Sequence, residues 1–170
     1  TFLLDFRHIL AVYVNRSTTE RLYVTDVLTG IYNRHGFYRN IGEVMRRSQK
    51  TGNPFAVISM DMDGLKGIND TYGHAEGDYA LKKIGDFMRK ATTSGEICAR
   101  FGGDEFLIVL CSENASERVD EIVNEIKSDI EYFNAFGNKP YYLNMSIGIY
   151  TKIADKTDTC LLYTSPSPRD

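Results

Sequence analysis

Acidic residues stand after two apolar segments, at positions where they could share one ligand. Asp61 directly follows the apolar run Phe55 to Met60, and Asp104 and Glu105 follow the pair Gly102-Gly103. If the second segment lies beside the first, Asp61 and Asp104 face one gap, where carboxylates repel each other unless a divalent cation lies between them. Two interpretations stay open: two unrelated acidic turns, or one Mg²⁺ site completed by water and phosphate oxygens.

The segment between these acids has groups suited to a nucleotide. Gly64 and Gly67 allow exposed backbone N–H groups, and Lys66 offers a point charge for phosphate. The spacing is not that of a Walker-type phosphate loop. Asn69 and Asp78 carry the amide and carboxylate groups that can hydrogen-bond the edges of guanine. Taken singly, each of the two is also an ordinary turn or helix-end residue.

Hydrophobic periodicity predicts the elements that must position these groups. Helices are expected over 34–50 with Asn33 as N-cap, over 77–90 and over 115–133, and strands over 55–60, 97–101, 105–111 and 141–150. The two apolar runs around Gly102-Gly103 predict a β-hairpin. The order of elements indicates an α/β (α+β) sandwich, with a mixed central sheet and helices packed on it.

Composition limits the class of protein. The 170 residues are 42% hydrophobic and 25% charged, which is typical of one globular domain with a real core. A net charge of −3 argues against a nucleic-acid-binding domain. No apolar run reaches the roughly 18 residues of a membrane helix. Three cysteines without a framework spacing favour a reduced, cytoplasmic setting.

The two ends of the chain differ from its middle. Residues 1–24 have loose helical periodicity, which indicates a connector helix that pairs with a second copy or, alternatively, a first core helix. Because the chain starts with Thr1, we expect it to come from a longer protein. Residues 159–170 hold two of the four prolines and no amphipathic pattern, which predicts a disordered or non-native tail.

Four successive motifs resemble the signatures of one family, in the family's order and spacing. They are Asp26-Val27-Leu28-Thr29-Gly30-Ile31-Tyr32-Asn33-Arg34, Asp61 to His74, Gly77-Asp78, and Arg100-Phe101-Gly102-Gly103-Asp104-Glu105-Phe106. Together they are similar to the GGDEF family, the bacterial diguanylate cyclases, over about residues 22 to 150. The resemblance implies a domain over 25–158, a fold related to nucleotide cyclase and polymerase palm domains, and a reaction that joins two GTP into cyclic di-GMP and releases two pyrophosphates.

The resemblance also implies roles for single residues. The metal ligands would be Asp61, Asp104 and the Met62 carbonyl, holding Mg²⁺ or Mn²⁺ with two ions per site. The substrate-binding residues would be Asn69 and Asp78 at guanine, with Gly64, Leu65, His74, Gly102 and Gly103 around the nucleotide. Lys66 would stabilise phosphate charge. Asp104, or else Glu105, would take the proton of the attacking 3′-hydroxyl, although metal activation alone could suffice.

A site that holds one GTP cannot alone make a product with two guanosines, so the resemblance implies a catalytic homodimer with twofold symmetry. It also implies a sensor or membrane domain upstream in the parent protein. The alternative is a catalytically inactive GTP- or effector-binding module, and a third possibility is a structural domain with acidic turns. Two departures from the family stand out. Thr93 and Glu96 replace its product-inhibition pair, and residues 159–170 lack its C-terminal helix.

Overall fold

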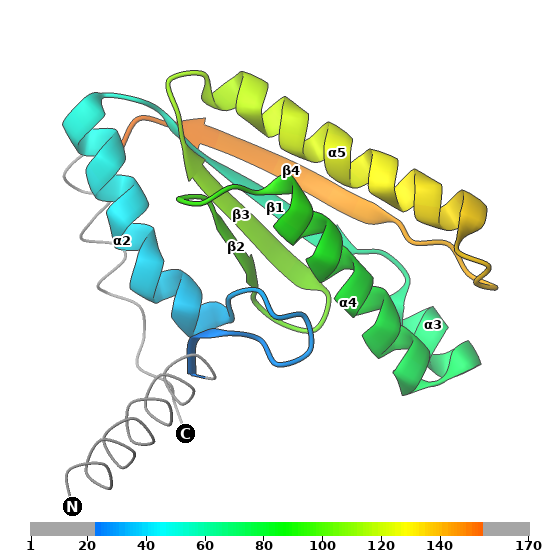
Figure 1. The fold of residues 1–170 in the computed structure, drawn as a ribbon. Coiled ribbons are helices and arrows are strands. Elements are labelled where there is room, and N and C mark those ends of the chain that lie inside the picture. Colours follow the sequence, from blue (N-terminus) through cyan, green and yellow to red (C-terminus); the bar gives the residue numbers. More distant parts are fainter. Residues whose placement is uncertain (1–22, 155–170) are drawn as a thin grey trace, which may run out of the picture.

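The computed structural model describes residues 23–154, which form a sheet with helices packed on it (Figure 1). In chain order the elements are α2 (Arg34–Thr51), β1 (Phe55–Met62), α3 (Leu65–Tyr72), α4 (His74–Ala91), β2 (Ile97–Arg100), β3 (Glu105–Cys111), α5 (Ala115–Phe136) and β4 (Met145–Lys152). The expected connector helix lies almost wholly outside the described residues, and the expected tail over 159–170 lies entirely outside them.

Helix α2 begins as the sequence predicts. The Asn33 side chain accepts a hydrogen bond from the Gly36 backbone N–H at 2.8 Å, so Asn33 is the N-cap. Its Nδ2 also donates to the carbonyls of Tyr23 and Thr25, at 3.0 and 3.1 Å. Asn33 therefore fixes the start of α2 and the loop before it together.

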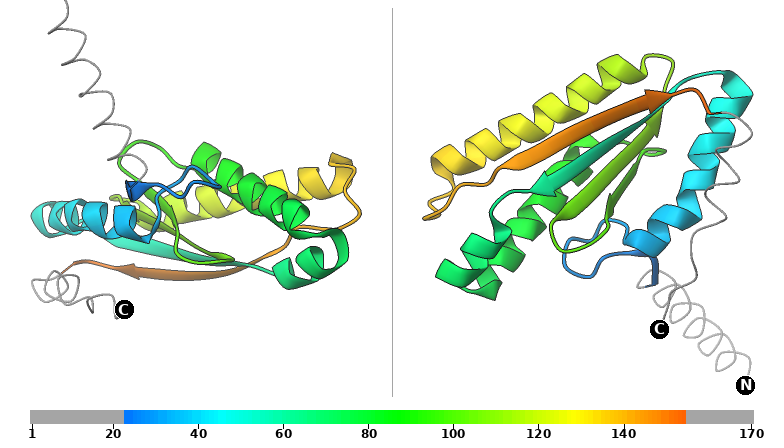
Figure 2. Two further views of the ribbon diagram at one scale, coloured as in Figure 1. Left: turned by 90° about the horizontal axis from the view of Figure 1, so that it is seen from below. Right: turned by 180° about the vertical axis from the view of Figure 1, so that it is seen from behind.

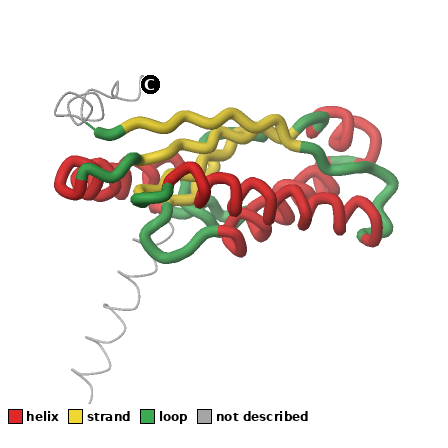
Figure 3. The backbone as a smooth tube through the Cα atoms, turned by 90° about the horizontal axis from the view of Figure 1, so that it is seen from above, coloured by secondary structure: helices red, strands yellow, loops and turns green. Residues whose placement is uncertain are grey.

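The sheet has the strand order β2-β3-β1-β4 and forms a single twisted layer (Figure 3). The palm-like α+β class is confirmed, but neighbouring strands within residues 23–154 pair antiparallel rather than in a mixed sheet. The reason is topological: β1 and β2 run in the same direction, as their helical connection allows, but β3 lies between them. In the part of the chain that the structure describes, the one parallel contact is the isolated bridge between Tyr32 and Ala99.

Strand β1 carries one core on each face. Ala56, Ile58, Met60 and Met62 are buried under α4 and α5, which lie side by side on one face of the sheet (Figures 1 and 2). Phe55 and Val57 point the other way and pack in the cluster that α2 forms with β2 and β3. Ser59 and Asp61 continue that second face, but they are exposed. The acidic end of β1 is therefore open to ligands.

The structure adds one helix to the sequence prediction and moves the start of two other elements. Helix α3 was not predicted, because one buried side chain, Ile68, cannot establish a period. Helix α4 begins at His74 instead of residue 77, and β4 begins at Met145 instead of residue 141. Tyr141 and Leu143 are buried from an irregular segment, so their apolar character indicates core packing and not strand pairing.

Candidate functional site

The sheet register brings the two acidic segments together. Asp61 near the end of β1 stands directly across from Glu105 at the start of β3. The Met62 backbone N–H donates to the Asp104 carbonyl at 3.0 Å. The β2–β3 hairpin thus lies beside β1, which is the arrangement that a shared site requires.

Adjacent residues of a strand point to opposite faces of the sheet, which would direct Glu105 away from Asp104. Glu105 nevertheless lies near this site. Residues directly opposite in an antiparallel pair project from the same face, so Asp61 and Glu105 are same-face neighbours. A Cβ placed on Gly102 would lie 3.4 Å from Glu105 Oε2, so this carboxylate extends back toward the hairpin turn. Asp104 is half-buried in the turn itself, before the alternation of β3 begins. Asp61, Asp104 and Glu105 therefore gather at one end of the sheet.

Asp63, the other acid after β1, is directed toward β4. Its carboxylate accepts hydrogen bonds from Asn144 Nδ2 at 2.7 Å and from Ser146 Oγ at 2.8 Å. Its backbone N–H donates to the Asn144 carbonyl at 3.0 Å. Asp63 is therefore a positioning residue that ties the loop after β1 to the start of β4. Sequence reasoning missed this role, because no pattern connects positions 63 and 144.

Arg100 holds the hairpin turn in place. Its Nε and Nη2 donate to the Gly103 carbonyl at 3.1 and 2.8 Å, and its Nη1 lies 3.2 and 3.3 Å from the carboxylate oxygens of Asp26. Asp26 also accepts from the Thr29 N–H and hydroxyl, at 2.8 and 2.6 Å. Because Gly103 precedes Asp104, this contact orients the catalytic candidate. The sequence signal for this contact is that Asp26 begins the first of the four motifs and the oppositely charged Arg100 begins the last.

The pKa of Asp26 reflects this arrangement. Burial by itself would raise the pKa of the carboxyl group, but the hydrogen bonds from Thr29 and the nearby charge of Arg100 hold it below its ordinary value. Asp26 is therefore ionised at neutral pH and remains a partner for the guanidinium.

Helices α3 and α4 bring the two candidate guanine residues together. A Cβ on Gly77 would overlap Asn69 Oδ1, so the Asn69 amide packs directly on the backbone beside Asp78. His74 is the exposed first residue of α4. The structure thus places the Asn69 amide next to the helical turn that carries Asp78, and amide and carboxylate groups are those that can hydrogen-bond a guanine edge.

The start of α3 offers backbone donors. Gly64 has a φ of +73°, a left-handed conformation that glycine adopts without strain. The first helical hydrogen bond runs from the Ile68 N–H to the Gly64 carbonyl, so the N–H groups of Leu65, Lys66 and Gly67 have no acceptor within the helix. The Lys66 side chain is exposed at the same end. This end of α3 therefore suits an anionic group.

A part-buried network supports the first turn of α4. Lys139 Nζ lies 2.9 and 2.8 Å from the Glu76 carboxylate oxygens, and the Tyr141 hydroxyl donates to Glu76 at 2.8 Å. The hydrogen bonds from Lys139 and then Tyr141 hold the pKa of Glu76 below its usual range. Burial, together with the contact to Glu76, raises the pKa of Tyr141. The segment before β4 is thereby fastened to the helix that carries Asp78.

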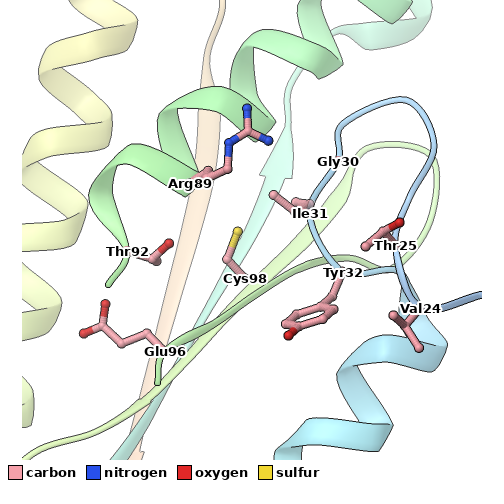
Figure 4. Close-up of a pocket in the computed structure, with 9 residues that line it drawn as sticks. All are labelled: Val24, Thr25, Gly30, Ile31, Tyr32, Arg89, Thr92, Glu96 and Cys98. Atoms are coloured by element: carbon pink, nitrogen blue, oxygen red, sulfur yellow. The ribbon is translucent and has the colours of Figure 1, made fainter. Parts of the chain in front are cut away.

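A separate cavity of about 420 Å³ lies between the loop before α2, the end of α4 and the start of β2 (Figure 4). It contains none of the candidate site residues, but Glu96 lines it. Arg118 donates to Glu96 from Nε and Nη2 at 2.7 and 2.9 Å, and the Thr93 N–H donates at 2.8 Å. Burial would raise the pKa of Glu96, yet these partners hold it below its ordinary value.

The donor set at the acidic end fits a hard divalent cation that shares its shell with a substrate. Within residues 23–154 no three His, Cys, Asp or Glu side chains form a group that could hold a metal ion unaided. Two carboxylates and a backbone carbonyl are nevertheless what Mg²⁺ takes from a protein when phosphate and water oxygens supply the rest. None of the helices in this part of the chain is long and apolar enough to cross a bilayer.

Comparison with known proteins gives a family match over most of the chain. The model of the family described as "Diguanylate cyclase, GGDEF domain" matches residues 23–164. Diguanylate cyclase A of Treponema denticola is 28% identical over 143 residues, which is 82% of this chain and 38% of that protein. An uncharacterized membrane protein of Staphylococcus aureus is 31% identical over 147 residues, which is 85% of this chain and 40% of that protein. The chain thus spans well under half the length of these relatives.

Solved structures agree with the family match. The coiled coil and GGDEF domain of DgcB from Caulobacter crescentus, in complex with c-di-GMP, superposes with a TM-score of 0.77 at 21% identity, covering 94% of this chain and 88% of that one. The GGDEF domain of TpbB (YfiN) from Pseudomonas aeruginosa superposes with a TM-score of 0.66 at 28% identity, covering 74% of each chain. With its fold, its four motifs and the match over residues 23–164, the chain belongs to the GGDEF domain family.

Proposed function

We propose that this domain is an active diguanylate cyclase, which condenses two GTP into cyclic di-GMP and two pyrophosphates. The observation that carries the proposal is the convergence of Asp61, Asp104 and Glu105 at one end of neighbouring strands. Asp61 and Glu105 are exposed carboxylates opposite each other on neighbouring strands, an arrangement that a divalent cation would stabilise. The family supports the same chemistry.

Each residue then has a defined task. Asp61, Asp104 and the Met62 carbonyl would hold the metal, taken as Mg²⁺ or Mn²⁺ with two ions per site. When bound, the metal neutralises phosphoryl charge and acidifies the attacking hydroxyl. Lys66 and the free N–H groups of α3 bind the phosphates, and the exposed Gly102-Gly103 turn leaves them room. Asp104 would accept the proton of the 3′-hydroxyl, with Glu105 as the alternative acceptor.

The guanine base is bound by Asn69 and Asp78, with His74 near the nucleotide. Because one domain binds one GTP, the proposed active form is a homodimer in which each copy presents its nucleotide to the other. We place the domain in the cytoplasm, where GTP is available and where the free thiols of Cys98 and Cys111 stay reduced. In the parent protein a sensor or membrane domain would control the pairing.

Incubation with GTP and Mg²⁺, followed by mass spectrometry, tests the proposal. An active cyclase yields cyclic di-GMP and pyrophosphate, and EDTA abolishes both. Tight GTP binding without product would instead establish the inactive, GTP-binding module. If isothermal titration calorimetry shows no Mg²⁺-dependent GTP binding, the protein is neither an active cyclase nor a GTP-binding module.

Replacing Gly77 by Ala is expected to weaken GTP binding without unfolding the domain. The new methyl group would overlap Asn69 Oδ1, and the Asn69 side chain can rotate away only by leaving the guanine. Loss of one base contact should raise the KM for GTP by about 10-fold or more. The control is Gly42→Ala in α2, where a Cβ would meet nothing within 4 Å. An unchanged KM in Gly77→Ala would remove Asn69 from the base site.

Feedback inhibition through the position of Thr93 and Glu96 is not expected. The Glu96 carboxylate already accepts hydrogen bonds from Arg118 and from the Thr93 N–H, and residue 93 brings no cation. Turnover should therefore persist as cyclic di-GMP accumulates. High-affinity product binding that Glu96→Gln abolishes would contradict this prediction.

A further inference from the structure

An aromatic groove of about 300 Å³ lies between α4 and α5, outside the site described above. Both helices contribute aromatic side chains to its lining: Tyr79 and Phe87 from α4, and Tyr132, Phe133 and Phe136 from α5. Helix α4 also contributes Lys83. Phe133 is buried at its base, with the ring centroids of Tyr79 and Phe87 at 6.3 and 6.5 Å. We call this feature the α4–α5 groove.

The outer wall of the groove is unusually apolar for an exposed surface. Tyr132 and Phe136 are 67% and 68% exposed. They lie one helical turn apart, and their ring centroids are 4.9 Å apart. The two rings therefore pack on each other rather than into the core. Clusters of this kind mark binding surfaces, because aromatic side chains lose little entropy when a partner covers them.

The dimensions of the groove suit a helix. The lining runs from Tyr79 to Phe87 on α4 and from Asp129 to Gly137 on α5, which is about 12 Å along each helix at 1.5 Å per residue. Two turns of a third helix cover that distance. Apolar side chains at positions i, i+4 and i+7 of such a helix would face the aromatic rings.

The charge of the groove selects the partner. Lys83 has no ion-pair partner among the described residues, and its Nζ lies 5.5 Å from the centre of the Tyr79 ring. Asp129, the acid at the edge, is already paired with Lys90 at 2.8 Å. Lys90 also lies 3.7 Å from Glu125, so Lys83 is the charged residue of the described lining that has no ion pair. We propose that the α4–α5 groove binds an amphipathic helix of another protein, with apolar anchors on Tyr132 and Phe136 and a carboxylate facing Lys83.

A designed peptide tests the proposal without knowledge of the natural partner. The probe is a fluorescein-labelled 18-residue helix with Leu at i, i+4 and i+7 and Glu on both flanks, and its matched control has Lys in place of Glu. Fluorescence anisotropy should show saturable binding of the Glu peptide to the domain and no binding of the Lys peptide. Tyr132→Ser should raise its Kd by about 10-fold or more. Tyr142→Ser, which removes an aromatic ring 77% exposed outside the groove lining, should leave the Kd unchanged.

Charge exchange makes the test specific. The Lys83→Glu variant should no longer bind the Glu peptide and should bind the Lys peptide instead, because the unpaired charge of the described lining then has the opposite sign. Tyr132, Phe136 and Tyr142 are exposed and Lys83 is half-buried, so circular dichroism is used to check that each variant is folded. Equal binding by all variants would overturn the proposal. So would sedimentation that shows a concentration-dependent dimer abolished by Phe136→Ser, because the occupant would then be a second copy. Neither outcome depends on cyclase activity.

Discussion

Replacing Asp61 by Asn lowers the rate of cyclic di-GMP formation by about 100-fold or more, with the fold intact. The amide keeps the shape of the side chain but loses the negative charge that would hold the metal. Because Asp61 is exposed, its loss costs little stability, and the thermal midpoint should stay within about 2 °C. Mass-spectrometric rate measurements at saturating GTP and Mg²⁺, with differential scanning calorimetry, give both quantities.

Asp104→Asn should show a loss of the same size, and Glu105→Gln should separate the roles of the two acids in the hairpin. If Glu105 only neighbours Asp61, its variant retains most of the rate and its pH profile. If it takes the proton, the rate falls as steeply as in Asp104→Asn. Asp120→Asn, at an exposed position on α5, is the matched control and should retain full activity. Full activity in Asp61→Asn would end the proposal of a cyclase centre at this site.

Replacing Arg100 by Ala is expected to destabilise the domain and loosen the hairpin turn. The side chains of Arg100 and Asp26 are only 15% and 23% exposed, so the substitution leaves a partly buried carboxylate and the Gly103 carbonyl without their donor. A loss of about 2 kcal/mol in the free energy of unfolding is expected. That corresponds to about 6 °C in the thermal midpoint for a domain of this size.

The control for Arg100 is Arg46→Ala. Arg46 pairs with Glu43 at 2.7 Å, but the two side chains are 69% and 66% exposed, so its removal should cost about 0.5 kcal/mol or less. Arg100→Lys keeps the charge without the forked geometry and should recover only part of the stability. Equal midpoints for Arg100→Ala and Arg46→Ala would show that the turn does not need this contact.

The same contact predicts a dependence of stability on pH. Since the pKa of Asp26 is lower in the folded protein than its ordinary value of 3.8, its ionised form favours folding. This contribution is complete above the ordinary value and is lost as the pH falls through the lowered folded value. Urea unfolding from pH 7 to pH 2 should therefore show a difference between wild type and Asp26→Asn that shrinks below about pH 4. A constant difference would contradict the assignment.

Several features of the domain could be predicted from the sequence, because they depend on local patterns. Asn33 begins a helix because its side chain accepts a hydrogen bond from the Gly36 backbone N–H three residues later, which needs only neighbouring residues. The apolar run of β1 predicts a strand buried on both faces, and the paired glycines predict the hairpin. The four motifs identify the family through order and spacing alone.

Other features were decided by contacts between distant residues. The short helix α3 depends on tertiary support for one buried residue, and Tyr141 is buried without joining a strand. Asp63 stands two residues after Asp61, yet its partner is Asn144, 81 residues away. The register that sets Asp61 against Glu105 follows from how two strands align, and neither strand encodes that alignment by itself.

The sequence by itself determined which chemical groups this protein has: paired acids, an amide and a carboxylate for a purine, and glycines where a chain must turn. Only the tertiary structure decided which of these groups meet, which of them support others, and where an aromatic groove remains uncovered. The physical reason is the distance along the chain over which each kind of interaction acts. Capping and periodicity act within a few residues, whereas a binding site forms where separate elements pack, and that packing is set by the whole core.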